Sequence, residues 1–337
     1  YINRVFITDK CDALVPSYLR FIKGLVDTQD IDLNVSREML QNNPAVSKIS
    51  KSLVGKILRE LKKVSEKNVD GYKSFWKEYG AVLKEGLYED AERKETLLDL
   101  CRFSTNENDE IMSLSSYLEK MPENQKDIYY ISAETRSQAL ASPHLEGFKS
   151  KNIPVLIMTD AIDQFWLPMI GSFKDKKFTS ITQGQINLDD LDEKNKDKKS
   201  DSKDQKEKQD KEFVDLIAQM KVVLGEQVKD IRLSSKLTDS PVCLVADDGD
   251  MDIAMEQLMA QRDTNYKGAP RILEINGDHS LIKNMKSLLS KKENNDLVSD
   301  AGTLLFEQAR LLEGKMPADP AQFSKIMNQF LLKAIPE

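Results

Sequence analysis

The sequence is poor in cysteine and histidine, which limits the kinds of site it can build. Three cysteines, Cys11, Cys101 and Cys243, are odd in number and far apart, and no two of them have a CxxC spacing. This pattern predicts neither a zinc site nor a disulfide framework, and free cysteines are typical of a reducing compartment such as the cytoplasm. Because the only histidines are His144 and His279, we expect no histidine-based metal site.

Long apolar runs are also missing. No stretch approaches the roughly 20 apolar residues needed to cross a bilayer. The first residues, YINRVFIT, do not form a signal peptide, and they have the composition of a strand with no initiator methionine. A sequence that starts inside a strand predicts a fragment of a longer protein.

Charge of one sign does not dominate the sequence. It has 49 basic and 56 acidic residues and a formal net charge of −7, so we expect no general binding to nucleic acid. It contains no phosphate-binding loop, dinucleotide glycine fingerprint, nucleophile elbow or metal cluster. These absences argue against a stand-alone enzyme that acts on small molecules.

The length of 337 residues suits two or three domains. We predict a strand over residues 1–8 and a helix over 15–25, from β-branched content and from helical spacing respectively. Long amphipathic helices are predicted over 44–67, 71–89 and 90–100. Three such helices with short connections predict a helical coil that joins two mixed α/β units.

A βαβ pattern follows the helical coil. DIYYIS, from residue 127, and PVLIMT, from residue 154, predict two parallel strands that flank short helices. Lys177–Gln183 can add a third strand. Residues 192–212 contain no apolar side chain, so they form either a mobile linker or an extension of the helix predicted from Phe213.

The last third of the sequence predicts a smaller α/β domain that ends in helices. Its predicted strands are VKDIRLSS, PVCLVADD and RILEIN, and helices are expected over 213–228, 251–263, 279–291, 296–313 and 319–335. The fold class is therefore α+β or α/β with several domains: mixed α/β units joined by a helical coil, then a small α/β domain with terminal helices.

The segment Asp30–Pro44 carries an unusual arginine. Ser36 is a good helix N-cap, and Arg37 follows it in the first turn, where the helix dipole favours acids. The planar guanidinium of Arg37 suits a phosphate or a carboxylate. On physical grounds alone, a surface arginine paired with a nearby acid is the simpler interpretation.

Three stretches give the sequence a resemblance to a known family. They are VFITDKCDALVPSYLRFIKGLVDTQDIDLNVSREMLQNN, SAETRSQALASPHLEGFK and GTLLFEQARLLEGKMPADPAQFSKIMNQFLLKAI. All three resemble the 90-kDa heat-shock protein chaperones. Since the sequence does not end in an EEVD-type peptide, the bacterial or organellar form is implied.

The resemblance implies an ATP-dependent chaperone with a divided nucleotide site. Arg37 would reach the terminal phosphate of ATP, with Asn34 and Gln41 as polar neighbours, while ATP and Mg would be bound mainly by an N-terminal domain that this sequence lacks. The 337 residues alone should then hydrolyse no ATP. The resemblance also implies a middle domain over 1–191, a charged linker over 192–212 and a dimerisation domain over 213–337. Within the middle domain, 1–43 would belong to a large α/β subdomain, 44–120 to the helical coil and 121–191 to a small α/β subdomain.

Two apolar segments are candidates for binding client proteins. Apolar residues crowd one side of the predicted helix 251–263, which is either an ordinary core stripe or a deformable binding surface. The resemblance points to the second. The adjacent aromatics Phe165 and Trp166 cannot both face one core, so at least one is expected at the surface. The family has an acid and a tryptophan where this sequence has Gln164 and Phe165. The client-binding candidates are Phe165, Trp166, Met251, Met255, Leu258 and Met259.

The terminal helices carry more apolar surface than a small domain needs. Packing on the preceding sheet would bury part of it, but a four-helix bundle across a twofold axis would bury more, and we favour this homodimer. The residues predicted to form it are Leu304, Leu305, Leu311, Leu312, Phe323, Ile326, Met327 and Phe330. The alternative function is a helical dimeric scaffold that recruits partners and needs no arginine for ATP.

Overall fold

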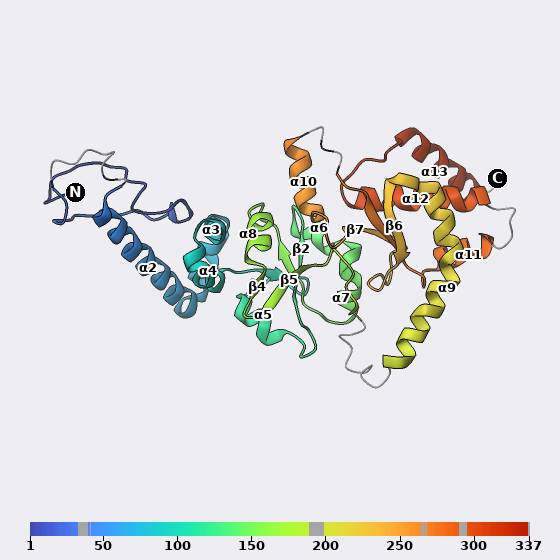
Figure 1. Ribbon diagram of the computed structural model, residues 1–337, viewed down its shortest axis with the longest axis horizontal. Coiled ribbons are helices and arrows are strands. Elements are labelled where there is room, and N and C mark those ends of the chain that lie inside the picture. The colour runs from blue at the N-terminus through green and yellow to red at the C-terminus, as the bar shows by residue number, and fades with distance from the viewer. Residues whose placement is uncertain are drawn as a thin grey trace. The chain divides into compact units, whose positions relative to one another are not determined.

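The computed structural model of the chain forms two compact units (Figure 1). Unit 1 contains residues 1–104, 109–120 and 160–177, and unit 2 contains residues 105–108, 121–159 and 178–337. The residues that the structure describes are 1–32, 40, 42–188, 199–263, 266, 268–289 and 295–335. Within them, no helix is both long and apolar enough to cross a membrane.

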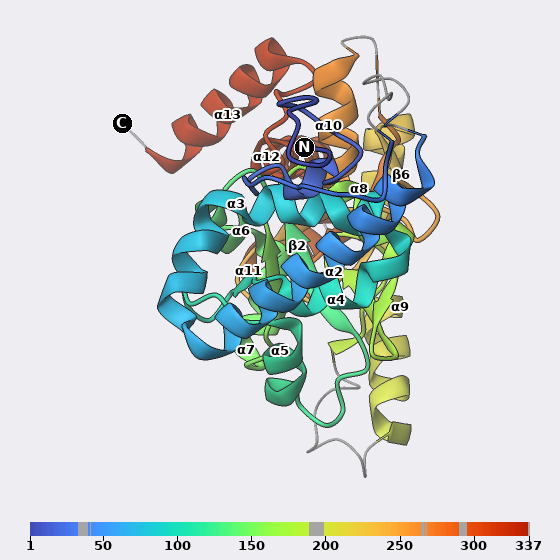
Figure 2. The same cartoon turned by 90° about the vertical axis from the view of Figure 1, so that its left-hand side faces the viewer.

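Three helices form most of unit 1. They are α2 (Pro44–Lys67), α3 (Val69–Glu89) and α4 (Lys94–Leu100), and they confirm the three helices predicted from periodicity. Asn43 starts α2, because its side chain accepts a hydrogen bond from the backbone N–H of Ala45. Figure 2 shows these helices next to one another. The other elements of unit 1 are η1 (Ser17–Leu19), η2 (Ala91–Arg93), α5 (Leu114–Lys120), α8 (Asp163–Ile170) and β4 (Ser172–Phe173).

Both secondary-structure predictions for the first 25 residues were wrong. Asn3 and Arg4 have positive φ values of 49° and 65°, a turn conformation that interrupts a strand. The predicted helix over 15–25 is reduced to η1. The side chain of Tyr18 is buried next to Gly86 of α3, and its hydroxyl donates to Asp90 at 2.7 Å. This tertiary contact, rather than local helix propensity, determines the conformation of the segment.

Unit 2 begins with the predicted βαβ arrangement. The strand β2 (Ile128–Ser132) pairs in parallel with β3 (Leu156–Met158) and with the end of β5 (Lys176–Ser180). The predicted third strand is therefore confirmed as β5. Between β2 and β3 lie the helices α6 (Arg136–Leu140), η3 (Pro143–Leu145) and α7 (Glu146–Ser150), and the short strand β1 (Ser104–Thr105) precedes them all.

The second sheet of unit 2 has the order β6-β8-β7. Strands β6 (Val228–Leu233) and β8 (Arg271–Ile275) are parallel, and β7 (Val242–Val245) is antiparallel to β8. Figure 1 shows α9 (Lys199–Leu224), α11 (Ser280–Leu289) and α12 (Asn295–Leu312) around this sheet. Their apolar faces share one core with the strands, which includes Phe213, Leu216, Met220, Leu244, Leu273, Ile282, Val298, Leu305 and Phe306.

The helices of this region extend the predicted pattern. They are α9 (Lys199–Leu224), η6 (Gly225–Gln227), α10 (Ile253–Arg262), α11 (Ser280–Leu289), α12 (Asn295–Leu312) and α13 (Pro320–Ala334). Residues 199–212 continue the helix from Phe213, as one of the two interpretations of the charged tract expected, and residues 192–198 lie outside the described part. The mixed α and β content agrees with the predicted fold class. The compact units do not test the predicted domain boundaries, which stay predictions.

Candidate functional site

Three residues are predicted to face ATP. Asn34, Arg37 and Gln41 all lie outside the described residues. Ile31, which precedes them, and Leu40, between Arg37 and Gln41, are described, and both are buried in one apolar cluster of unit 1.

The aromatic pair of α8 divides between the interior and the surface of unit 1. Trp166 is completely buried, so it is not available as a surface anchor in this structure. Its Nε1 donates to Asp163 at 2.7 Å. Phe165 is half-buried, with its ring centroid 6.3 Å from that of Tyr88. Tyr88 and Met169 are exposed, so Phe165 remains a candidate for binding at the surface.

A buried ion cluster fixes α8. Asp163 is fully buried, and Lys84 of α3, also buried, lies 2.9 Å from Asp163 and 2.8 Å from Asp160. Burial alone would lower the pKa of Lys84, but Asp163 and Asp160 outweigh it and raise that pKa above its ordinary value. The ion pairs of Lys84 with Asp163 and Asp160 therefore tie α3 to the start of α8, the helix that carries Phe165.

The apolar side chains of α10 are only partly covered. Of the whole helix, only Ile253 and Glu256 are buried. Met251, just before the helix, is 39% exposed, and the remaining candidates Met255, Leu258 and Met259 are half-buried. An ordinary core stripe would have buried them, so the pattern favours an accessible apolar surface.

Polar contacts fix the start of α10. Asp252 caps the helix by accepting from the N–H of Ala254 at 2.9 Å. Its other carboxylate oxygen accepts from the hydroxyls of Ser180 and Thr182, at 2.5 Å and 2.9 Å. One carboxylate therefore joins α10 to the end of β5 and the residues that follow it.

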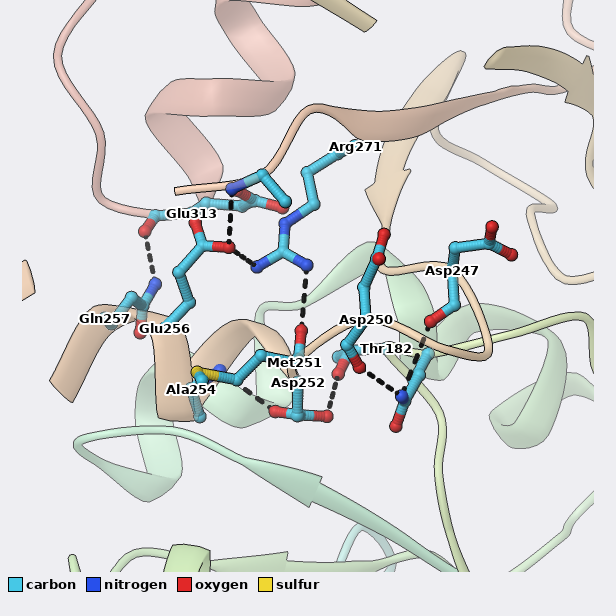
Figure 3. A network of polar contacts seen from close by, with 12 residues as sticks. Thr182, Asp247, Asp250, Met251, Asp252, Ala254, Glu256, Gln257, Arg271 and Glu313 are labelled. Atoms are coloured by element: carbon cyan, nitrogen blue, oxygen red, sulfur yellow. Dashed lines mark hydrogen bonds and ion pairs between the residues drawn. The ribbon is translucent and has the colours of Figure 1, made fainter. Parts of the chain in front are cut away.

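A second buried ion cluster lies beside α10 (Figure 3). The Glu256 carboxylate pairs with Arg271 of β8 at 2.5 Å and with Lys315 at 3.0 Å. Glu313 lies in the same cluster, 3.5 Å from Lys315, and its side chain is 8% exposed. The cluster joins α10, β8 and the segment between α12 and α13.

Glu313 is the titratable member of this cluster. Burial raises the pKa of Glu313 to about 7, although the positive charges of Lys315 and Arg271 act against this rise. Among the described residues, neither carboxylate oxygen of Glu313 has a hydrogen-bond partner, and its ion pair with Lys315 is long, at 3.5 Å. Protonation of Glu313 therefore occurs near neutral pH.

The two terminal helices differ in how far the chain buries them. α12 contributes Val298, Leu305 and Phe306 to the core of unit 2, as the alternative of packing on the sheet expected. In α13 only Ile326 is buried, whereas Leu332 is 76% exposed. The apolar residues left exposed in and near α13 are Leu311, Leu312, Met316, Met327, Leu331, Leu332 and Ile335.

The predicted dimerisation residues separate accordingly. Leu305 and Ile326 are buried within the chain and serve its own core. The other six keep surface that a partner could cover: Leu304, Phe323 and Phe330 are half-buried, and Leu311, Leu312 and Met327 are exposed.

Comparison with known proteins decides the family. The sequence model of one family, described as Hsp90 protein, matches residues 1–336. The chain belongs to the Hsp90 family. It is 43% identical over 337 residues to a protein of Roseobacter denitrificans named "Chaperone protein HtpG", and 44% identical over 335 residues to a protein of the same name from Paramagnetospirillum magneticum. Each comparison covers 99% of this chain.

The Hsp90-family relatives are longer proteins. The match covers 54% of the Roseobacter protein and 53% of the Paramagnetospirillum protein. A third HtpG, from Streptomyces coelicolor, is 40% identical over 328 residues, which are 97% of this chain and 50% of that protein. The chain thus spans about half the length of the curated relatives it matches.

The sequence reasoning missed the buried ion clusters of this Hsp90-family chain. One signal was present for the cluster beside α10: Glu256 is three residues after Ile253, so both lie on one helix face. A charge on the buried face of an amphipathic helix needs a partner. For Lys84 the signal was weaker, because lysines are common on all three helices of the coil.

Replacing Lys84 tests the first cluster. Lys84→Met leaves the Asp163 carboxylate buried with no partner in α3, so the free energy of unfolding should fall by about 3–5 kcal/mol. Urea unfolding, followed by helical circular dichroism, measures the change. Lys63→Met is the matched control, since Lys63 and its partner Glu60 are both exposed, and it should change stability little. Equal effects of the two variants would contradict the assigned role of Lys84.

Replacing Glu313 tests the second cluster through pH. A carboxyl group whose pKa is raised in the folded state lowers the free energy of unfolding as pH rises from about 4.5 to 7, because its ionisation is opposed by burial. The glutamine of Glu313→Gln cannot ionise, so the variant does not suffer this loss. Its free energy of unfolding relative to the wild type should therefore be about 2 kcal/mol higher at pH 8 than at pH 5. Urea unfolding at both pH values measures it. The exposed Glu226→Gln is the control, and a pH-independent effect of Glu313→Gln would contradict the assignment.

Proposed function

We propose that this chain is the client-binding and dimerisation part of an ATP-dependent molecular chaperone that assists protein folding during stress. Membership of the Hsp90 family supports the chaperone class, as do relatives named chaperones. The observation that carries the proposal is the accessible apolar surface of α10. A chaperone must hold unfolded chains without a fixed sequence, and methionine suits this because its side chain is flexible and polarisable.

The client surface consists of Met251, Met255, Leu258 and Met259. Their partial exposure gives an unfolded polypeptide apolar area to cover, while Ile253 and Glu256 hold the helix from below. Phe165, with Tyr88 beside it, is a second client contact on unit 1. Trp166 supports that contact from the interior, where it is buried.

Homodimerisation uses the exposed face of α13. Met327, Leu331 and Leu332 are exposed in the described chain, and water-exposed apolar area of this kind favours association. A bundle formed by α12 and α13 from two chains would cover it. The dimer then holds two client surfaces in one assembly.

The residues proposed to act on ATP lie outside the part of the chain that the structure describes. Arg37 contacts the terminal phosphate, with Asn34 and Gln41 nearby, while a domain outside these 337 residues supplies most of the contacts to ATP and Mg. Arginine there would neutralise charge that develops during phosphoryl transfer. The three free cysteines are compatible with the cytoplasm as its location.

Polar substitutions on α10 test the client surface. Met255→Ser with Leu258→Ser should weaken binding of a permanently unfolded protein, such as reduced carboxymethylated α-lactalbumin, by roughly ten-fold, because two apolar contacts are lost. Fluorescence anisotropy of the labelled client measures the affinity. Val222→Ser, at an exposed site on α9, is the control. Unchanged affinity in the α10 variant would refute the client surface.

Removing the arginine tests the link to ATP. In the full-length protein, Arg37→Ala should lower ATP turnover by up to about 10³-fold, since the terminal phosphate loses its cation. A coupled assay of released ADP measures the rate. Arg59→Ala, on the exposed side of α2, should leave it unchanged. Equal turnover in Arg37→Ala and the wild type would contradict the role of Arg37 and favour a scaffold.

A further inference from the structure

The helix α10 is weakly anchored by apolar contacts. Ile253 is its one buried apolar residue. A cavity of about 670 Å³ lies beside it, with Ile253, Glu256 and Gln257 on one wall and Leu312 and Glu313 on another. Because side chains of the described residues leave this space open, the position of the helix depends on its polar contacts.

Two adjacent residues of α10 hold the segment between α12 and α13. Glu256 pairs with Lys315 at 3.0 Å. The Gln257 side chain donates to the backbone carbonyl of Glu313 at 2.7 Å, as Figure 3 shows. Glu256 is 3% exposed, so solvent screens little of the ion pair at its carboxylate end. A displacement of α10 must move residues 313–315 or break both contacts.

The same segment leads directly into α13. Only residues 316–318 separate Lys315 from Asp319, which caps α13 by accepting from the N–H groups of Ala321 and Gln322. The N–H of Ala318 donates to Glu307 of α12 at 3.1 Å. A segment this short and this well bonded transmits a shift of Lys315 to the first turn of α13.

We infer that Glu256 and Gln257 are positioning residues that couple client binding on α10 to dimerisation through α13, by means of their contacts with Lys315 and Glu313. The inference rests on the proposed function, since it uses both the client surface and the dimer. Coupling between two sites is reciprocal. A bound client should therefore change the dissociation constant of the dimer, by roughly five-fold or more.

The test uses the whole 337-residue chain and an uncoupled variant, Gln257→Ala with Lys315→Met. In this variant Glu256 keeps its partner Arg271, and the Lys315 side chain is already 34% exposed, so the fold should persist. The matched control is Gln219→Ala with Lys283→Met, which removes a hydrogen bond to Ser299 and an ion pair with Asp278 elsewhere in unit 2. Analytical ultracentrifugation gives the dimer dissociation constant with and without saturating carboxymethylated α-lactalbumin.

In the wild type and in the control variant, bound client should shift the dimer dissociation constant. The uncoupled variant should show no such shift. The single variant Lys315→Arg, which keeps a cation at this position, should show the shift again. If Gln257 and Lys315 only supported the local structure, the uncoupled variant would have a changed dimer dissociation constant, and bound client would still shift that constant. If client binding and dimerisation both occur but no shift is found, or if the shift persists in the uncoupled variant, the coupling is refuted and the proposed function stands. If no client binds or no dimer forms, the proposed function fails and the coupling fails with it.

Discussion

A charge that is removed from water must be paired inside the protein, and this requirement governs the positions of the helices that carry the candidate sites. In unit 1 the buried ammonium of Lys84 holds Asp163 and Asp160. In unit 2 the buried carboxylate of Glu256 holds Arg271 and Lys315. Such pairs contribute little net stability compared with apolar residues of the same volume, but losing one partner is costly. They therefore determine where a helix lies.

Because ion pairs and hydrogen bonds position these helices, some of their apolar side chains remain at the surface. Polar contacts hold α10 through Asp252, Glu256 and Gln257, so Met255 and Leu258 need not enter the core. In α13 the chain itself buries only Ile326. Apolar surface in both helices is consequently accessible; in the proposed function an unfolded client would cover that of α10, and a second copy of the chain would cover that of α13.

Periodicity predicted the long helices well, because their amphipathic faces are continuous and their ends carry caps. α2 spans Pro44–Lys67, the predicted range, since Asn43 and Pro44 are strong local start signals. The strand β5 and the βαβ arrangement also followed from local patterns. The first 25 residues did not, because contacts with α3 override their local preference, as the burial of Tyr18 beside Gly86 shows.

The candidate sites were less fully predictable from the sequence than the long helices were. Apolar spacing identified α10 and the terminal helices, yet it could not separate Leu305, which faces the core, from Leu312, which is 58% exposed. That difference depends on which neighbours the fold supplies. The ion clusters join residues that are far apart in sequence, such as Lys84 and Asp163 or Glu256 and Lys315, and a pattern within one helix does not reveal its partner in another.

The most direct test of the account is the solution mass of the chain by light scattering across a dilution series. The wild type should be a dimer that dissociates on dilution, and Met327→Lys with Leu331→Lys should be a monomer with unchanged helical content, since a pair of charges cannot be buried across the twofold axis without partners. A wild-type chain that is monomeric at every concentration, or a double variant that dimerises as tightly as the wild type, would contradict the account.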